Sequence, residues 1–302
     1  MAKDTILFTY EEVKEDDTDI FQVLKVKEES YYEAIIIRLL SGTINIIDKK
    51  DNNCIKARTN YLMLGTVENQ DDLLTIDLIN RCILPDIDEA SINCYILYNK
   101  SNNDFFRRLL TEMTHFIVCQ SKERFTEAFV HLYRISEYIS YSFPLIYAAQ
   151  ATSYLNTFDT IKSFFGNGTS GGELGFFKEF QKIIIDKDIL DLNYEMSYIV
   201  NADIVCYVKK SFETIAKEAP MNITDNSILI QNKSIFSLIL SLRNKYFHMA
   251  SKSRNLLEPN IDMNNIFNII NNACFNWIAY IYNQIALSGI SRATLIDEEN
   301  NE

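Results

Sequence analysis

FTEAFVHLYRISEYISYSF, residues 125–143, is the stretch that decides the fold. Its apolar residues recur at intervals of three or four, the period of an amphipathic helix. These positions are Phe125, Ala128, Phe129, Leu132, Ile135, Ile139 and Phe143. Pro144 follows directly and marks a kink or an end of the helix. The stretch therefore predicts a helix that buries one face in a helical bundle.

Similar helical patterns extend this prediction along residues 101–292. We expect helices over 102–120, 151–165, 173–184, 202–217, 230–250 and 262–288, with Asp262 as an N-cap after Pro259. Segment 166–175 holds five of the eight glycines but lacks the Gly-Lys-Ser/Thr ending of a phosphate loop, so it is interpreted as a connector. Residues 293–302 are expected to form a frayed acidic tail.

The first hundred residues have a different pattern. Short β-branched and aromatic runs alternate with polar turns such as residues 48–53, which favours strands with one helix among them. The runs cover residues 5–10, 20–26, 32–47, 61–67, 73–84 and 92–98. We therefore expect an α+β chain, with a small mixed or β-rich domain over 1–100 followed by the helical bundle.

Composition narrows the class of protein. The chain of 302 residues has a formal charge of −12, which argues against broad electrostatic binding to nucleic acid, so any RNA has to be bound locally. Its six cysteines contain no Cys-x-x-Cys pair, so neither a zinc site nor any other metal or cofactor is expected. With no apolar run long enough to span a membrane and no secretion signal at Met1, the sequence predicts a cytoplasmic protein.

The strongest functional signal is the hexapeptide Arg-Asn-Lys-Tyr-Phe-His at residues 243–248. It places an arginine, an asparagine and one of only three histidines near the end of an apolar helix. Residues 226–257 contain no Asp or Glu, so the hexapeptide lies in the one strongly basic neighbourhood of an acidic chain. Lys245, Lys252 and Arg254 in this neighbourhood are candidate RNA contacts.

The helical period separates the polar residues of this region from its apolar face. Ile235, Leu238, Ile239, Leu242, Tyr246 and Met249 form the apolar face, whereas Ser237, Ser241, Asn244 and His248 form a polar ridge. Arg243 is about 100° from Asn244 around an ideal helix and about 140° from His248. Either its long side chain must therefore bend around the helix to join the ridge, or the helix must be distorted there.

These residues suit RNA cleavage without a metal. A histidine can take a proton from a ribose 2′-hydroxyl or give one to a leaving oxygen, and a guanidinium can hold phosphate oxygens as charge builds. Strand transesterification needs both a base and an acid, whereas the hexapeptide offers one histidine. A two-fold dimer with its motif helices face to face would supply both.

An Arg-Asn-x-x-x-His motif late in a helical bundle, followed by one more long helix, resembles the signature of HEPN-domain proteins. Many of these proteins are metal-independent endoribonucleases of toxin–antitoxin, CRISPR-associated and abortive-infection systems. The resemblance implies a bundle that dimerises through its motif helices, with Arg243 and His248 as the catalytic pair and Asn244 orienting the site. Residues 1–100 are not covered by it.

Other polar side chains have two interpretations each. Glu137 either forms an intrahelical ion pair with Arg134 or is the acidic residue that some bundles of this type direct at the histidine. His115 and His131 are interpreted as packed or surface histidines. The asparagines of the last helix are interpreted as a polar outer face rather than as base contacts.

Two functions from different classes follow. The first is an endoribonuclease that cleaves cellular RNA in antiviral defence or as a toxin, working as a homodimer. Its N-terminal domain would bind a regulatory protein or ligand. The alternative is a non-catalytic helical interaction module of a multi-protein defence complex, which the acidic composition also suits.

Overall fold

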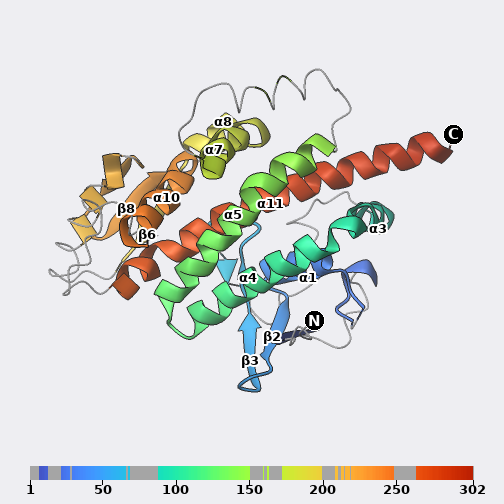
Figure 1. Ribbon diagram of the computed structural model, residues 1–302, viewed down its shortest axis with the longest axis horizontal. Helices are drawn as coiled ribbons and strands as arrows, with labels where there is room; N and C mark the ends of the chain where they lie inside the picture. Colours follow the sequence, from blue (N-terminus) through green and yellow to red (C-terminus); the bar gives the residue numbers. More distant parts are fainter. Residues whose placement is uncertain are drawn as a thin grey trace.

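The computed structural model describes residues 7–12, 22–27, 29–65, 67–68, 88–149, 172–198, 219–247 and 263–301, with 159, 162, 208–209, 212–213 and 215–217 between them. Over these residues the chain has an α+β fold, as the sequence predicts. Figure 1 shows long helices crossing the centre of the molecule, with a small sheet on one side and a second sheet near one end. His248, Lys252, Arg254 and Asp262 lie outside the described residues, as do most of the helices predicted over 151–165 and 202–217.

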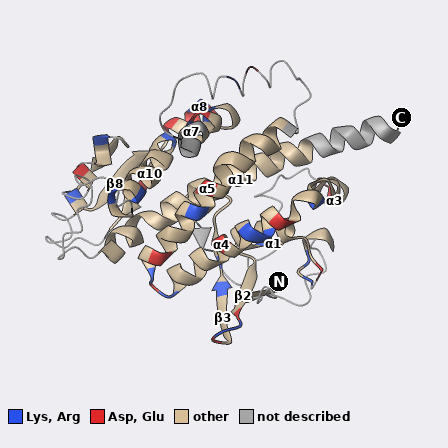
Figure 2. Ribbon diagram, viewed as in Figure 1, with Lys and Arg blue, Asp and Glu red and all other residues tan. Residues whose placement is uncertain are grey.

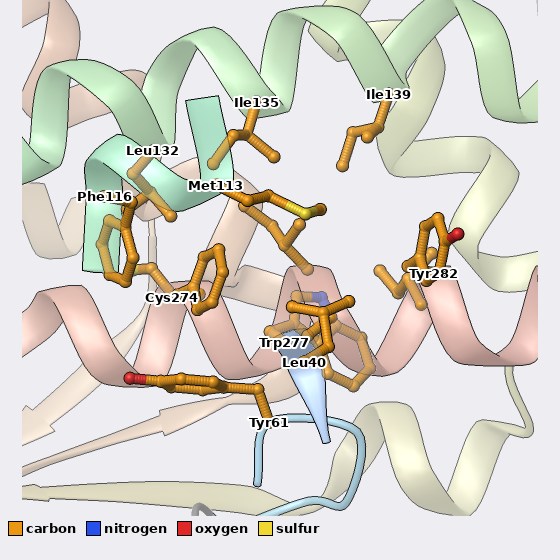
Figure 3. Packing of buried hydrophobic residues seen from close by; sticks show 14 of the residues in the cluster. Leu40, Tyr61, Met113, Phe116, Leu132, Ile135, Ile139, Cys274, Trp277 and Tyr282 are labelled. Atoms are coloured by element: carbon orange, nitrogen blue, oxygen red, sulfur yellow. The ribbon is translucent and has the colours of Figure 1, made fainter. Parts of the chain in front are cut away.

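Helix α5 (Phe125–Ala149) lies at the centre of the core, between α4 (Asn103–Ser121) and α11 (Met263–Asn301). The predicted apolar face is confirmed: Ala128, Phe129, Leu132, Ile135, Ile139 and Phe143 are all fully buried. Figure 3 shows Leu132, Ile135 and Ile139 of this face directed towards α11 across the core. Pro144 lies inside α5, so the helix does not end at the proline.

The N-terminal part combines a sheet with two helices. Strands β1 (Phe8–Glu12), β2 (Ile44–Asp48) and β3 (Asn53–Ala57) form an antiparallel sheet in that order, and β4 (Thr59–Asn60) pairs with β5 (Val67–Glu68). Helix α1 (Tyr32–Leu40) packs against α4. The run at 92–98 belongs to helix α3 (Glu89–Tyr98) rather than to a strand, because the Asp88 carboxylate accepts a hydrogen bond from the Ser91 N–H and caps the helix.

The C-terminal half contains a sheet that the helical pattern did not predict. Strands β6 (Asn193–Ser197), β8 (Ser227–Gln231) and β7 (Met221–Ile223) pair antiparallel in that order. Helices α7 (Gly172–Ile184) and α8 (Lys187–Asp191) precede it. Strand β8 occupies the start of the helix predicted over 230–250, so α10 (Ile235–Tyr246) begins five residues later than expected.

Helix α11 connects the parts of the fold through its asparagines. The Asn276 amide donates to the carbonyl oxygens of Tyr61 and Met63, and its own oxygen accepts from the Gly65 N–H. Both Asn271 and Asn276 are completely buried. These two asparagines therefore join segments rather than forming a polar outer face, which corrects the prediction for them. The helix continues to Asn301, so the backbone of the predicted frayed tail is helical up to that residue.

Candidate functional site

Helix α10 presents the first two residues of the motif at its C-terminal end. Its predicted apolar face is buried, with Ile235, Leu238, Ile239 and Leu242 fully covered and Tyr246 nearly so. The Arg243 guanidinium donates a hydrogen bond from Nη1 to Oδ1 of Asn244 at 3.1 Å. The long side chain therefore bends to reach Asn244, which is the first of the two predicted alternatives, and α10 is an α-helix through Tyr246.

Two matched pairs connect α10 to α5. Cζ of Arg243 lies 4.7 Å from the centre of the Tyr133 ring, a cation–π contact. One turn further along α10, the Phe247 ring stacks on Phe129 with centroids 5.8 Å apart and an interplanar angle of 16°. Residues 129 and 133 are four apart on α5. Residues 243 and 247 are also four apart, near the end of α10 and directly after it. The two pairs therefore lie one helical turn apart along the contact between the helices.

Glu137 joins the same cluster as the next position along the α5 face. The Tyr133 hydroxyl donates to Oε1 of Glu137 at 2.6 Å, which links the carboxylate to Arg243 through the ring. The predicted ion pair between Arg134 and Glu137 is wrong, because Arg134 instead contacts Glu112 of α4 at 3.4 Å. The structure therefore brings together Arg243, Asn244, Tyr133 and Glu137, and Tyr133 is the member that the sequence did not single out.

Solvent reaches this cluster. Arg243, Asn244, Tyr133 and Glu137 are each partly exposed, so the cluster is not enclosed in the core. Lys245 is also partly exposed, and its ammonium lies 5.4 Å from the centre of the Tyr246 ring. Figure 2 shows basic and acidic segments interspersed over the described ribbon. Any polyanion would thus be held by a few local cations rather than by a wide basic face.

A second polar cluster lies on the α4 side of α5. The rings of His115 and His131 stack with centroids 4.7 Å apart and planes 8° apart, and the Nδ1–H of His131 donates to Glu112 at 2.7 Å. Burial, and then the neighbouring His131, lower the pKa of His115. These are packed histidines, as predicted. Their pairing was missed because they are 16 residues apart on separate helices.

The histidine pair is poorly shaped for a metal ion. Nitrogen lone pairs lie in the ring plane, and parallel stacked rings direct theirs along separate planes rather than at one point. Among the residues that the structure describes, no group of three or more His, Cys, Asp or Glu side chains is arranged to hold a metal. None of the helices in the described part of the chain has both the length and the hydropathy that a membrane-spanning segment needs.

Comparison of the chain with family models, with curated proteins and with solved structures found no match. The function of the chain is therefore inferred from the chemistry of its own residues.

Proposed function

We propose that the chain is a metal-independent endoribonuclease of the HEPN type that cleaves RNA by transesterification. Arg243 holds the scissile phosphate, Asn244 orients Arg243, and His248 transfers a proton. The observation that carries this proposal is the placement of Arg243, which is bent towards Asn244 and lies across the Tyr133 ring at a solvent-accessible helix end. An arginine stacked in this way keeps its N–H edge available for phosphate oxygens.

The proposal includes partners beyond the RNA. A homodimer through the motif helices would place two copies of the site near one substrate, and the cytoplasm is where cellular RNA would be met. In the N-terminal part, a cleft of about 640 Å³ has Lys25, Lys27 and Tyr31 in its lining, together with Glu89 and Asn93 of α3. Its size suits a small molecule, which supports regulation by a ligand there.

Incubation of the purified 302-residue chain with total RNA tests the reaction. We expect cleavage in the presence of EDTA that leaves 2′,3′-cyclic phosphate and 5′-hydroxyl ends. Arg243→Ala and His248→Ala should each reduce the rate by roughly 100-fold or more. Arg134→Ala is the matched control, because Arg134 is an exposed arginine that contacts Glu112 instead. Unchanged cleavage in both motif variants would remove the assignment.

The alternative is a non-catalytic interaction module. The observation that favours it is that Arg243 already has partners within the chain, so its charge has a structural use without RNA. Expression in cells separates the two functions. A nuclease arrests growth and each motif variant relieves the arrest, whereas an interaction module leaves RNA intact and depends on a protein partner.

A further inference from the structure

Phe247 is an exposed aromatic residue directly after the last residue of α10. It leaves 41% of its surface open to solvent, although a phenylalanine has no polar atom to present there. Its ring is nevertheless supported from behind: it stacks on Phe129 with centroids 5.8 Å apart and lies 6.0 Å from the ring of Phe267. Both supporting residues are fully buried. The core therefore holds an exposed ring in one orientation.

The position of Phe247 beside Arg243 gives this ring a use. A single exposed apolar side chain is ordinary on a protein surface. Here, however, the Phe247 N–H donates to the Arg243 carbonyl oxygen at 2.9 Å, so the helical spacing extends to Phe247 and the two side chains are neighbours. Lys245 adds a second, partly exposed cation to the same helix end. Aromatic rings next to cations are the combination that binds single-stranded nucleic acids.

We propose that Phe247 is a stacking platform for an unpaired nucleobase of the RNA whose phosphate Arg243 holds. The inference rests on the proposed function and names its substrate class, which is single-stranded RNA or the loop of a folded RNA. In a duplex each base stacks on its neighbours and pairs across the helix, so its ring face is closed to Phe247. Every base has a π-face, so stacking selects for unpaired bases rather than for a sequence.

The phosphate contact and the stacking surface are spaced to hold one nucleotide. Tyr133 supports the guanidinium at 4.7 Å, and Phe129, one turn earlier on the same helix, supports the Phe247 ring. Because both supports belong to α5, its pitch of about 5.4 Å sets the separation of the two contacts. A phosphate group and the base of the same nucleotide are a similar distance apart. Arg243 and Phe247 are both accessible to solvent, so RNA reaches them without opening the core.

The first test compares two short probes of equal length, a 2′-O-methyl oligoadenylate and the same backbone without bases. The 2′-O-methyl group blocks the nucleophile of the proposed reaction, so both probes stay intact. The purified 302-residue chain should bind the oligoadenylate roughly tenfold more tightly than the abasic probe. Phe247→Leu should remove most of this difference, whereas Phe247→Tyr should retain it. A difference of the same size in Phe247→Leu and in the parent overturns the inference.

Matched variants separate stacking from folding and from the phosphate contact. Tyr98→Leu removes an aromatic ring at the end of α3 that is 64% exposed, and it should leave both affinities unchanged. Arg243→Ala should reduce the slope of log affinity against log salt by about one, because it removes a phosphate contact. Phe247→Leu should leave that slope as it is. An equal fall in both variants would show that Phe247 only positions Arg243, which also overturns the stacking role.

The second test concerns strandedness. The parent should bind the single-stranded oligoadenylate more tightly than its duplex with 2′-O-methyl oligouridylate, and Phe247→Leu should reduce the ratio of the two affinities roughly tenfold. A ratio that Phe247→Leu leaves unchanged contradicts the assigned substrate class.

The outcomes separate the two proposals. If the parent protein neither binds nor cleaves RNA, or does either equally well without Arg243, the proposed function fails. If binding depends on Arg243 but Phe247→Leu keeps the full difference between the oligoadenylate and the abasic probe, only the role of Phe247 fails.

Discussion

Glu33 shows how a single residue can tie stability to pH. It is buried among Tyr95, Asn99 and Tyr282, and burial raises its pKa to about 8 although Tyr95 and Asn99 partly oppose the shift. Neither of its carboxylate oxygens has a hydrogen bond of good geometry. The folded protein therefore prefers the protonated carboxyl, whereas the unfolded chain ionises it near pH 4.5.

We expect the contribution of Glu33 to weaken as pH rises from about 4.5 to 8, because the folded state retains a proton that the unfolded state releases. The contribution of Glu33 to the free energy of unfolding should fall by about 1.4 kcal/mol per pH unit within that window. Glu33→Gln removes this dependence and should be more stable than the parent at pH 8. Urea unfolding at pH 5 and pH 8 measures both effects, and equal slopes for the two proteins would contradict the expectation.

His115 makes the stability of the fold depend on pH in the opposite direction. Burial beside His131 lowers its pKa below 6.5, while Glu112 and Asp48 raise it and Arg124 adds a smaller lowering effect. The unfolded state therefore binds more protons just below pH 6.5, and stability is lost as pH falls through that range. His115→Phe keeps a ring against Phe8 and should lose less stability between pH 7 and pH 5 than the parent. Melting temperatures at the two pH values provide the comparison.

Within a single element, helix α11, asparagines stabilise the fold through hydrogen bonds to other segments. Asn276 forms three hydrogen bonds to the segment from Tyr61 to Gly65, one of them buried and two partly buried. Asn276→Ala leaves those backbone groups without partners, so we expect a loss of about 3 kcal/mol in the free energy of unfolding. Asn268 is exposed on the same helix, and Asn268→Ala should change it by less than about 0.5 kcal/mol. Similar losses in the two variants would show that the buried bonds add nothing.

The elements also show what periodicity can predict. The face of α5 and that of α10 follow from the three-or-four spacing, because a long amphipathic pattern has one way to bury its apolar side chains. The end of strand β8 was assigned to a helix, and the runs before residue 100 were predicted to be strands with one helix among them, without showing which. Short apolar runs fit a strand or a helix equally well, and only the Asp88 cap or the pairing of β8 with β6 and β7 decides.

The candidate site was predictable only in part. Arg243 and Asn244 were recognisable because they are adjacent in the chain and resemble part of a known motif. Tyr133 comes from a helix over a hundred residues earlier, and a tyrosine in an amphipathic helix resembles any other core residue. Glu137 had two interpretations because spacing within α5 showed Arg134 nearby but could not show that Arg134 turns towards α4.

At the scale of the whole molecule, one helix packs against both halves of the chain. Helix α11 contacts α3 on one side and α5, α7, α10 and β6 on others, and Tyr61 packs on its Phe275. We expect the regions before and after residue 100 to unfold in a single transition, because separating them exposes the same core. Trp277, the only tryptophan, is fully buried and donates to Gln181, so its fluorescence reports on this core. Fluorescence and circular dichroism should give coincident midpoints, whereas two separated midpoints would indicate independent domains.

The short connection between β8 and α10 determines which way the motif residues face around the axis of α10. Three residues, Asn232–Ser234, separate Gln231 at the end of the strand from Ile235 at the start of the helix. A single residue inserted there would rotate the residues of α10 by about 100° around the helix axis. This rotation is enough to move the Arg243 guanidinium away from the Tyr133 ring. Length variation at this junction is therefore far less tolerable than substitution, and the spacing from strand to arginine becomes a measurable signature for finding distant relatives of this chain.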